Sequence, residues 1–162
     1  MAEATPLPTG VTGFYTPGGP GVELSTFAAW GHAAARAIGA TLSGLAASHV
    51  TPNFHSLTLS SLPGWDPAWM VVVVCNDRHP IVAFCASRWL GGHGEFLPAE
   101  ALPAGLRETW ESFGPPLEIW TQERLLTPLS PALTEQLHPD ELRQFTYWKP
   151  WTVGDVVFNY WD

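Results

Sequence analysis

The sequence has 162 residues, a formal net charge of −8 and nine tryptophans. This length fits one globular domain over 1–162 and leaves little room for a second. Fifteen Asp and Glu residues face only seven Lys and Arg residues, and the basic residues form no cluster. That balance argues against nucleic-acid binding, which needs clustered cations to neutralise phosphates, and the many large aromatic side chains argue against a disordered chain.

The first 22 residues are rich in proline and glycine and are predicted to form an extended arm. The arm has no basic residue before position 22 and no apolar core, so it does not have the pattern of a signal or transit peptide. The apolar stretch 27–50 contains one arginine and two histidines, and we therefore expect no membrane span. Cys75 and Cys85 are expected to be buried free thiols, and the protein is expected to be cytoplasmic.

Small and apolar residues recur every three or four positions after Ser25, which is a suitable helix N-cap. This spacing predicts one long amphipathic helix over about 25–48. A stripe of small side chains along this helix lets another element approach closely, and we expect the stripe to pack on a sheet. Its members are Gly31, Ala35, Gly39 and Ser43.

Three strands are predicted next, over 53–62, 69–75 and 81–89. The first alternates between polar and apolar residues, as a half-buried strand does. The other two are apolar on both faces and flank the turn 76–80, so we expect a hairpin in the middle of a sheet that helices cover. In that hairpin the two cysteines lie about 13 Å apart along the ladder, which is too far for a disulfide.

The rest of the chain is predicted to contain a helix from Pro98, a strand at 117–121 and short helices. Ser130-Pro131 and His138-Pro139 each have the pattern of an N-cap followed by proline at the first helical position. Segment 152–161 begins with a capping-box pattern and continues at helical spacing. Its β-branched residues also suit a strand, so helix and strand both remain open there.

These elements predict an α+β fold, an antiparallel sheet of four or more strands that carries the long helix on one face. Short C-terminal helices would cover the other face or one end. In element order alone, and in no sequence motif, the chain resembles small acidic secretion chaperones and some toxin-immunity proteins. The resemblance implies a protein that acts by binding a protein partner.

No motif assigns an enzymatic activity. The chain has no Gly-x-Ser-x-Gly elbow, no phosphate-binding loop, no Gly-x-Gly-x-x-Gly at a helix start and no Cys-x-x-Cys pair. His93 and Glu95 have the His-x-Glu spacing of zinc deaminases, but the paired cysteines that such a site needs are missing. Because glycines surround His93, it and Glu95 remain candidates for a small-molecule pocket between sheet and helices.

Two further groups of polar residues could hold a metal if the fold joined them. The first is Asp77 with His79 in the hairpin turn, and the second is His138, Asp140 and Glu141 at a helix start. Turn formation and helix-dipole effects account for both groups without a metal. We therefore expect neither a metal nor a cofactor.

Acidic residues are concentrated between Glu95 and Glu141, a segment that contains nine carboxylates and only two arginines. Glu108 and Glu111 are predicted to lie on one exposed helix face. A surface of one sign steers an oppositely charged partner and speeds its association. The sequence therefore favours a partner with a basic surface.

Aromatic residues are concentrated after this region, since the last eighteen residues hold seven of them. Trp148 and Trp151 flank a Lys-Pro pair, which marks a surface turn, and partly exposed tryptophans commonly anchor interfaces. We therefore predict a non-enzymatic protein that binds a basic partner through Glu108, Glu111, Trp148 and Trp151. A homodimer through an exposed edge strand at 53–62 and a sugar-binding surface of exposed tryptophans are further interpretations.

Overall fold

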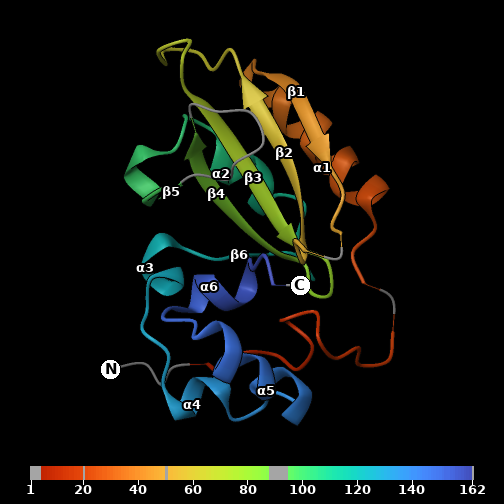
Figure 1. Cartoon of the computed structure of the whole chain (residues 1–162). Helices are drawn as coiled ribbons and strands as arrows, with labels where there is room; N and C mark the ends of the chain where they lie inside the picture. Colours follow the sequence, from red (N-terminus) through yellow and green to blue (C-terminus); the bar gives the residue numbers. More distant parts are fainter. Residues whose placement is uncertain (1–4, 20, 50, 88–94, 162) are drawn as a thin grey trace.

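The computed structural model describes residues 5–19, 21–49, 51–87 and 95–161, and it confirms the expected α+β fold (Figure 1). The strands that it contains are β1 (Thr41–Ala46), β2 (Phe54–Ser60), β3 (Met70–Asn76), β4 (Ile81–Ser87), β5 (Glu95–Phe96) and β6 (Glu118–Ile119). The helices are α1 (Leu24–Ile38), α2 (Leu106–Glu111), α3 (Gln122–Leu125), α4 (Pro131–Thr134), α5 (Pro139–Trp148) and α6 (Val153–Val157), with a 3-10 turn, η1, at Ala99–Ala101.

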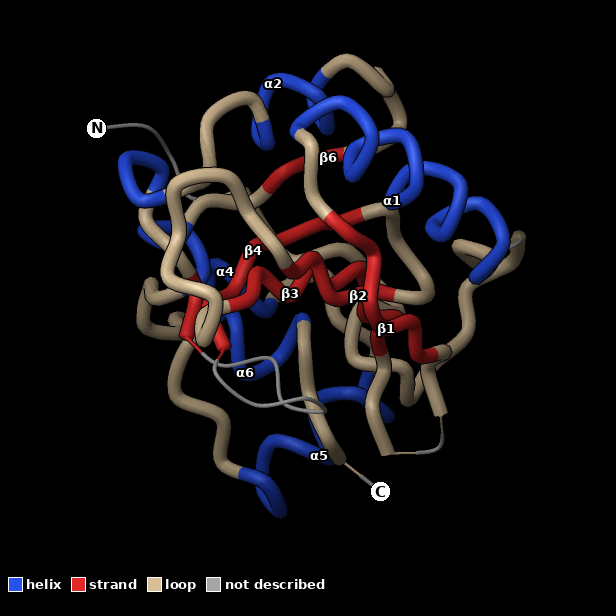
Figure 2. The backbone as a smooth tube through the Cα atoms, turned by 90° about the horizontal axis from the view of Figure 1, so that it is seen from above, coloured by secondary structure: helices blue, strands red, loops and turns tan. Residues whose placement is uncertain are grey.

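The strands form one sheet in the order β1-β2-β3-β4-β5, and β6 also pairs with β4. Neighbouring strands are antiparallel except for β4 and β6, which run parallel. The sheet is therefore mixed at its β4 border, where we had expected antiparallel pairing throughout. Figure 2 shows α1 and α2 on one side of the sheet and α5 and α6 on the other. Leu133 of α4 packs in the same core as Val156 of α6.

Helix α1 is shorter than the sequence analysis predicted, because it ends at Ile38 and not near position 48. Gly39 has a φ of 74°, a left-handed conformation that glycine adopts without strain and that commonly ends helices. The chain then forms β1, which the periodicity did not reveal because its small and apolar residues fit helical spacing as well. Since β1 pairs with β2, the segment 53–62 is an interior strand, and the expectation that it is an exposed edge for a homodimer was wrong.

Helix α1 approaches the sheet closely through its small residues. A Cβ atom on Gly31 would lie 2.3 Å from Cδ2 of Leu57, a buried residue of β2, so only glycine fits there without rearrangement. The stripe of small residues is confirmed for Gly31 and Ala35, which are both buried on the helix. Gly39 instead ends the helix, and Ser43 lies on β1.

The β3–β4 hairpin is buried on both faces, as the sequence predicted. Alternate side chains of β3 enter two separate cores: Val72 packs with the C-terminal helices, and Val71 packs with α1 and α2. Cys75 belongs to the α1 side and Cys85 to the opposite side, and both are free. The prediction that they form no disulfide with each other is confirmed.

The N-terminal segment packs against the C-terminal helices instead of forming a simple extended arm. Leu7 and Val11 are buried, and the backbone N–H of Leu7 donates to the Leu133 carbonyl at 2.8 Å. The side-chain amides of Asn53 and Asn76 donate to the Val11 carbonyl at 2.9 and 2.8 Å. The segment thereby joins the sheet to the helical layer beneath it (Figure 1).

The local signals in the C-terminal half predicted most helix starts. Proline follows Ser130 and His138 at the first positions of α4 and α5. Thr152 and Asp155 form the expected capping box, in which the Thr152 N–H donates to Asp155 Oδ2 at 2.9 Å. The open segment 152–161 is therefore helical over Val153–Val157 and irregular afterwards.

Two expected elements are shorter or divided. Gly105, with a φ of 81°, separates η1 from α2, so the helix predicted from Pro98 is two short pieces. The strand expected at 117–121 contains only the two residues of β6. In the part of the chain described above, no helix is both long and apolar enough to cross a membrane.

Candidate interaction surface

Exposed carboxylates gather on the elements that border β4. They come from β5, η1, α2, β6 and α3, and we call the set the acidic edge: Glu95, Glu100, Glu108, Glu111, Glu118 and Glu123. Strands β5 and β6 both pair with β4, and the Gln122 side-chain amide donates to the Phe96 carbonyl at 2.8 Å, which links α3 to β5. Residues spread over nearly thirty positions thus share one border of the fold.

The two arginines in this region differ, because Arg107 is paired with a carboxylate and Arg124 lies over an aromatic ring. Arg107 Nε lies 2.7 Å from Glu111 Oε1, which confirms the ion pair expected from their spacing of four. The guanidinium carbon of Arg124 lies 3.5 Å from the ring centroid of Trp120. Burial lowers the pKa of Arg124 and the Glu118 carboxylate opposes that shift, so the guanidinium stays charged. Among the described residues, most carboxylates of the acidic edge therefore have no ion-pair partner.

Trp148 and Trp151 lie in different environments although only two residues separate them. Trp148 is half-buried, and its ring stacks on that of Trp161 with centroids 6.4 Å apart and planes 5° apart. Trp151 is 76% exposed, while its backbone is held: its N–H donates to Asp155 Oδ2 at 3.0 Å, and its carbonyl accepts from Leu129 N–H at 3.0 Å. Trp148 belongs to the core, and Trp151 is presented to solvent on a fixed backbone.

The same backbone pairing places Trp151 beside α3. Pro128 forms a bridge with Thr152, and the Val153 N–H donates to the Thr127 carbonyl at 3.0 Å. Helix α3 carries Glu123 of the acidic edge and ends next to Leu126, which is 53% exposed. Trp151 therefore adjoins the α3 end of the acidic edge.

Glu108 and Glu111 form the α2 part of the acidic edge. Both are exposed on α2, which packs against α1 on the opposite face of the sheet from α5 and α6 (Figure 2). The four residues predicted to bind a partner consequently do not form one patch. Of the four, Trp151 lies beside the segment that follows α3, whereas Glu108 and Glu111 lie on α2.

No family model, curated protein or solved structure matches this chain. Function is therefore inferred from the chemistry and geometry of its surfaces.

Of the two residues expected to form a pocket, His93 and Glu95, the structure describes only Glu95. His93 lies outside the described residues, and Glu95 is exposed on β5, paired with Ala86 of β4. A gap between Leu97 and Ile119 nearby has a volume of only about 20 Å³, which holds at most a single water molecule. This hypothesis stays a prediction.

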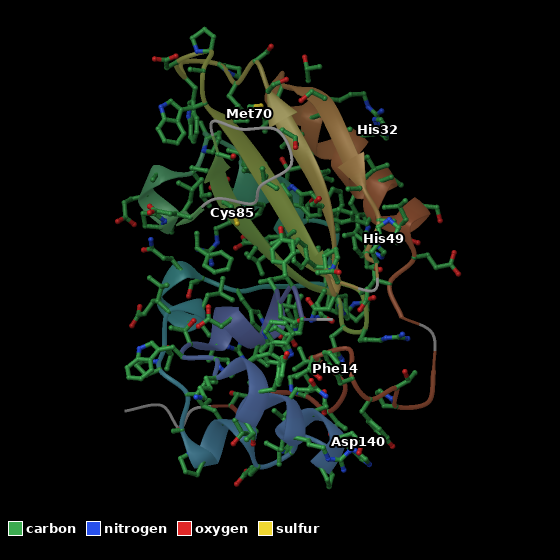
Figure 3. All side chains as sticks on the ribbon, in the orientation of Figure 1. Phe14, His32, His49, Met70, Cys85 and Asp140 are labelled. Atoms are coloured by element: carbon green, nitrogen blue, oxygen red, sulfur yellow. The ribbon has the colours of Figure 1, made fainter. Side chains whose placement is uncertain are left out.

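The residues considered as metal ligands have individual roles within the fold. The Glu141 side chain is fully buried and accepts hydrogen bonds from backbone groups, while His138 Nδ1 accepts from the Asp140 N–H at 3.1 Å and caps α5. Asp77 lies in the β3–β4 turn, 3.9 Å from Arg78 Nε. Figure 3 shows Asp140 at the end of the helical layer that is away from the sheet. Within the described ranges, no three His, Cys, Asp or Glu side chains converge as ligands.

The two cysteines lack the environment of a reactive thiol. Burial raises the pKa of both, and the charge of Asp77 raises that of Cys75 further. The protonated thiol is a poor nucleophile and a poor metal ligand. Cys85 lies within the sheet (Figure 3), where its side chain packs in the core shared with the C-terminal helices.

Sequence reasoning missed two features of this surface. The first is the contact of Arg124 with Trp120. The two residues are four positions apart, as neighbours on one helix face are, but Thr121 caps α3 and Trp120 therefore lies before the helix. The spacing could not be recognised as helical from the sequence. The proximity of Trp151 to α3 depends on the pairing of Pro128 with Thr152. No local signal reveals such pairing between single residues.

Proposed function

We propose that this protein binds a basic segment of another protein against the acidic edge, with Trp151 as an apolar anchor, and that it catalyses no reaction itself. The single observation behind this proposal is the accumulation of six exposed carboxylates on adjoining elements, of which only Glu111 is ion-paired with an arginine among the described residues. Trp151, which is 76% exposed, lies beside the segment that follows α3.

Charge complementarity selects the partner. Like-charged side chains on one border repel each other, and a cationic partner relieves that repulsion while gaining attraction to each carboxylate. Such attraction acts over about 10 Å at 0.1 M salt, so it speeds encounter more than it tightens the final complex. A tight complex needs a side chain that becomes fully buried in the interface, and tryptophan is among the residues that most often supply one.

The backbone of the anchor is fixed before binding. Two hydrogen bonds fix the Trp151 backbone, so only the side-chain torsions must be ordered when a partner covers the ring. Leu126 adds exposed apolar area on the chain that follows α3. The combination of a polar acidic rim with a small apolar centre is the usual arrangement of a protein interface.

The test compares two double variants with the same change in net charge. Glu100→Gln with Glu123→Gln alters the acidic edge, and Glu23→Gln with Glu135→Gln alters exposed carboxylates on other elements. Proteins retained by the tagged wild type from a lysate of the source cells are identified, purified and titrated against each variant at several salt concentrations. Circular dichroism confirms that every variant is folded.

The proposal requires a retained protein with a basic surface that binds in purified form. Its association with the edge variant should be about tenfold weaker, with a smaller salt dependence, while the control variant stays within about twofold of wild type. Trp151→Ala should speed dissociation of the same complex. Equal weakening by both double variants would show nonspecific attraction, and binding unaffected by the edge variant would place the partner elsewhere; either result overturns the proposal.

A further inference from the structure

A cleft separate from the Trp151 surface opens between the N-terminal segment, the turn before β4, β6 and α3. Its volume is about 300 Å³, at the low end of the range for small-molecule sites. Four prolines together with Ile81 and Trp120 form apolar walls, and the polar groups are Thr5, His79, Glu118, Arg124 and Gln136. We call it the arm cleft.

Arg124 is pre-organised in the arm cleft. Its guanidinium carbon lies over the Trp120 ring, 3.5 Å from the centroid, and Trp120 is itself buried. The indole N–H of Trp120 donates to Glu118 Oε2 at 2.9 Å, which fixes the ring. Among the described residues, none forms a hydrogen bond or ion pair with the guanidinium, so its N–H groups remain available. A fixed guanidinium with free donors suits bidentate binding of a carboxylate.

Two residues with acceptor groups, His79 and Glu118, also line the cleft. His79 Nε2 lies 2.8 Å from the Thr9 carbonyl, which accepts only, so Nε2 carries the proton and Nδ1 of the neutral ring is an acceptor. Among the described residues, none donates to that Nδ1. The Glu118 carboxylate supplies negative charge at the same cleft. An ammonium group would satisfy both acceptors.

We propose that the arm cleft binds a small zwitterion of amino-acid size with an apolar side chain. Arg124 holds the carboxylate, Glu118 and His79 face the ammonium group, and the prolines with Ile81 enclose the side chain. A ligand with two or more negative charges is disfavoured, because Glu118 lines the cleft and the whole chain has a net charge of −8. The cleft shares Glu118 with the acidic edge, but the two tests are separable, because the double variants leave Arg124, His79 and Glu118 unchanged.

Isotope-labelled protein provides the test, with the indole N–H of Trp120 as the reporter in ¹H–¹⁵N spectra. The probes are L-leucine and L-phenylalanine. N-acetyl-L-leucine lacks the ammonium group, L-leucinamide lacks the carboxylate, and inorganic phosphate represents a multivalent anion. Arg124→Gln removes the charge, Arg124→Lys keeps the charge without the planar fork, and Arg36→Gln on the exposed side of α1 is the matched control.

The expected result is a saturable shift of the Trp120 signal with leucine or phenylalanine, at least about tenfold weaker for the two blocked analogues. Arg124→Gln should weaken leucine binding by a similar factor, and Arg36→Gln should leave it unchanged. Absence of a shift with both amino acids up to about 10 mM would overturn the proposal, since a weaker site would have no use. Equal binding of a blocked analogue or of phosphate, or unaltered binding by Arg124→Gln, would overturn it as well.

Discussion

The hydroxyl of Thr12 donates a 2.7 Å hydrogen bond to the carboxylate of Glu141, which lies 129 positions further along the chain. The same carboxylate accepts from the backbone N–H groups of Thr12, Gly10 and His138, at 3.2, 3.0 and 2.9 Å. The Glu141 side chain is fully buried, so these four donors replace the water molecules that would otherwise solvate the carboxylate. Through them, the N-terminal segment and α5 are held together.

The first prediction concerns this carboxylate. Glu141→Gln replaces one acceptor oxygen by an NH₂ group that faces backbone donors, and at least one N–H loses its partner. We expect a loss of about 2–4 kcal/mol in the free energy of unfolding, because hydrogen bonds to a buried charged group are worth more than neutral ones. Urea denaturation measures the loss.

The control is Glu135→Gln, on an exposed carboxylate six positions earlier, which should change stability by less than about 0.5 kcal/mol. Hydrogen exchange should also accelerate at the amides of Gly10 and Thr12 in the Glu141 variant. If both variants are equally stable, the four hydrogen bonds do not hold the two segments together as described.

The second prediction separates the two neighbouring tryptophans. Trp148→Ala removes a ring that stacks on Trp161 and packs on the core, so we expect a loss of at least about 2 kcal/mol in unfolding free energy. Trp151→Ala removes a ring that is 76% exposed and should cost less than about 0.5 kcal/mol. Thermal unfolding of the two variants tests this prediction. Equal losses of unfolding free energy would contradict the assignment of Trp151 as a surface residue.

Sequence periodicity was most informative where local chemistry decides the structure. The apolar runs around Val71 and Val82 predicted a buried hairpin, and the capping patterns at Thr152 and His138 predicted helix starts. Each signal depends on residues close together in sequence. The register of β3 and β4 then follows from the short turn between them.

Long-range pairing set the limit of sequence reasoning. Segment 41–46 forms a strand because β2 is available beside it, and its own residues suit a helix equally well. Glu141 was explained by its position in the first turn of a helix, which is where it lies, but its burial depends on the N-terminal segment folding over it. The carboxylates of the acidic edge could be predicted from the sequence. That Glu108 and Trp151 lie on opposite sides of the sheet could not.

The third prediction is a fall in stability at alkaline pH caused by the two buried thiols. Burial raises the pKa of Cys75 and Cys85 in the folded state, while the unfolded chain has ordinary thiols with a pKa of about 8.5. Below that pH, both states keep the protons and the thiols add no pH dependence. Above it, the unfolded state loses protons that the native state retains, so the free energy of unfolding falls by about 1.4 kcal/mol per pH unit for each thiol.

Urea denaturation between about pH 8.5 and 10 measures this slope. Cys75→Ala with Cys85→Ala should flatten it, whatever the cost of the substitutions at neutral pH. Burial raises the pKa of Tyr160 too, but an unfolded tyrosine ionises near pH 10, so it adds to the slope only above this window. An unchanged slope in the double variant would show that the thiols are not protonated in the folded protein.

The last prediction concerns Asn76, which is fully buried at the end of β3 and connects three parts of the fold. Its amide nitrogen donates to the carbonyls of Val11 and Val157, both at 2.8 Å. Its oxygen accepts from the N–H groups of Arg78 and His79 in the turn, at 2.9 and 3.1 Å. All four polar contacts of the amide are therefore used.

Asn76→Asp keeps the acceptor for the turn but places a second oxygen against two carbonyl oxygens, and we expect a loss of about 3 kcal/mol or more in unfolding free energy at neutral pH. Asn53 provides the comparison, because its amide nitrogen donates to one carbonyl among the described residues, that of Val11, at 2.9 Å. Asn53→Asp should therefore destabilise the protein less than Asn76→Asp. The reverse order in parallel urea titrations would contradict the view that Asn76 is the principal polar link between the sheet, the N-terminal segment and α6.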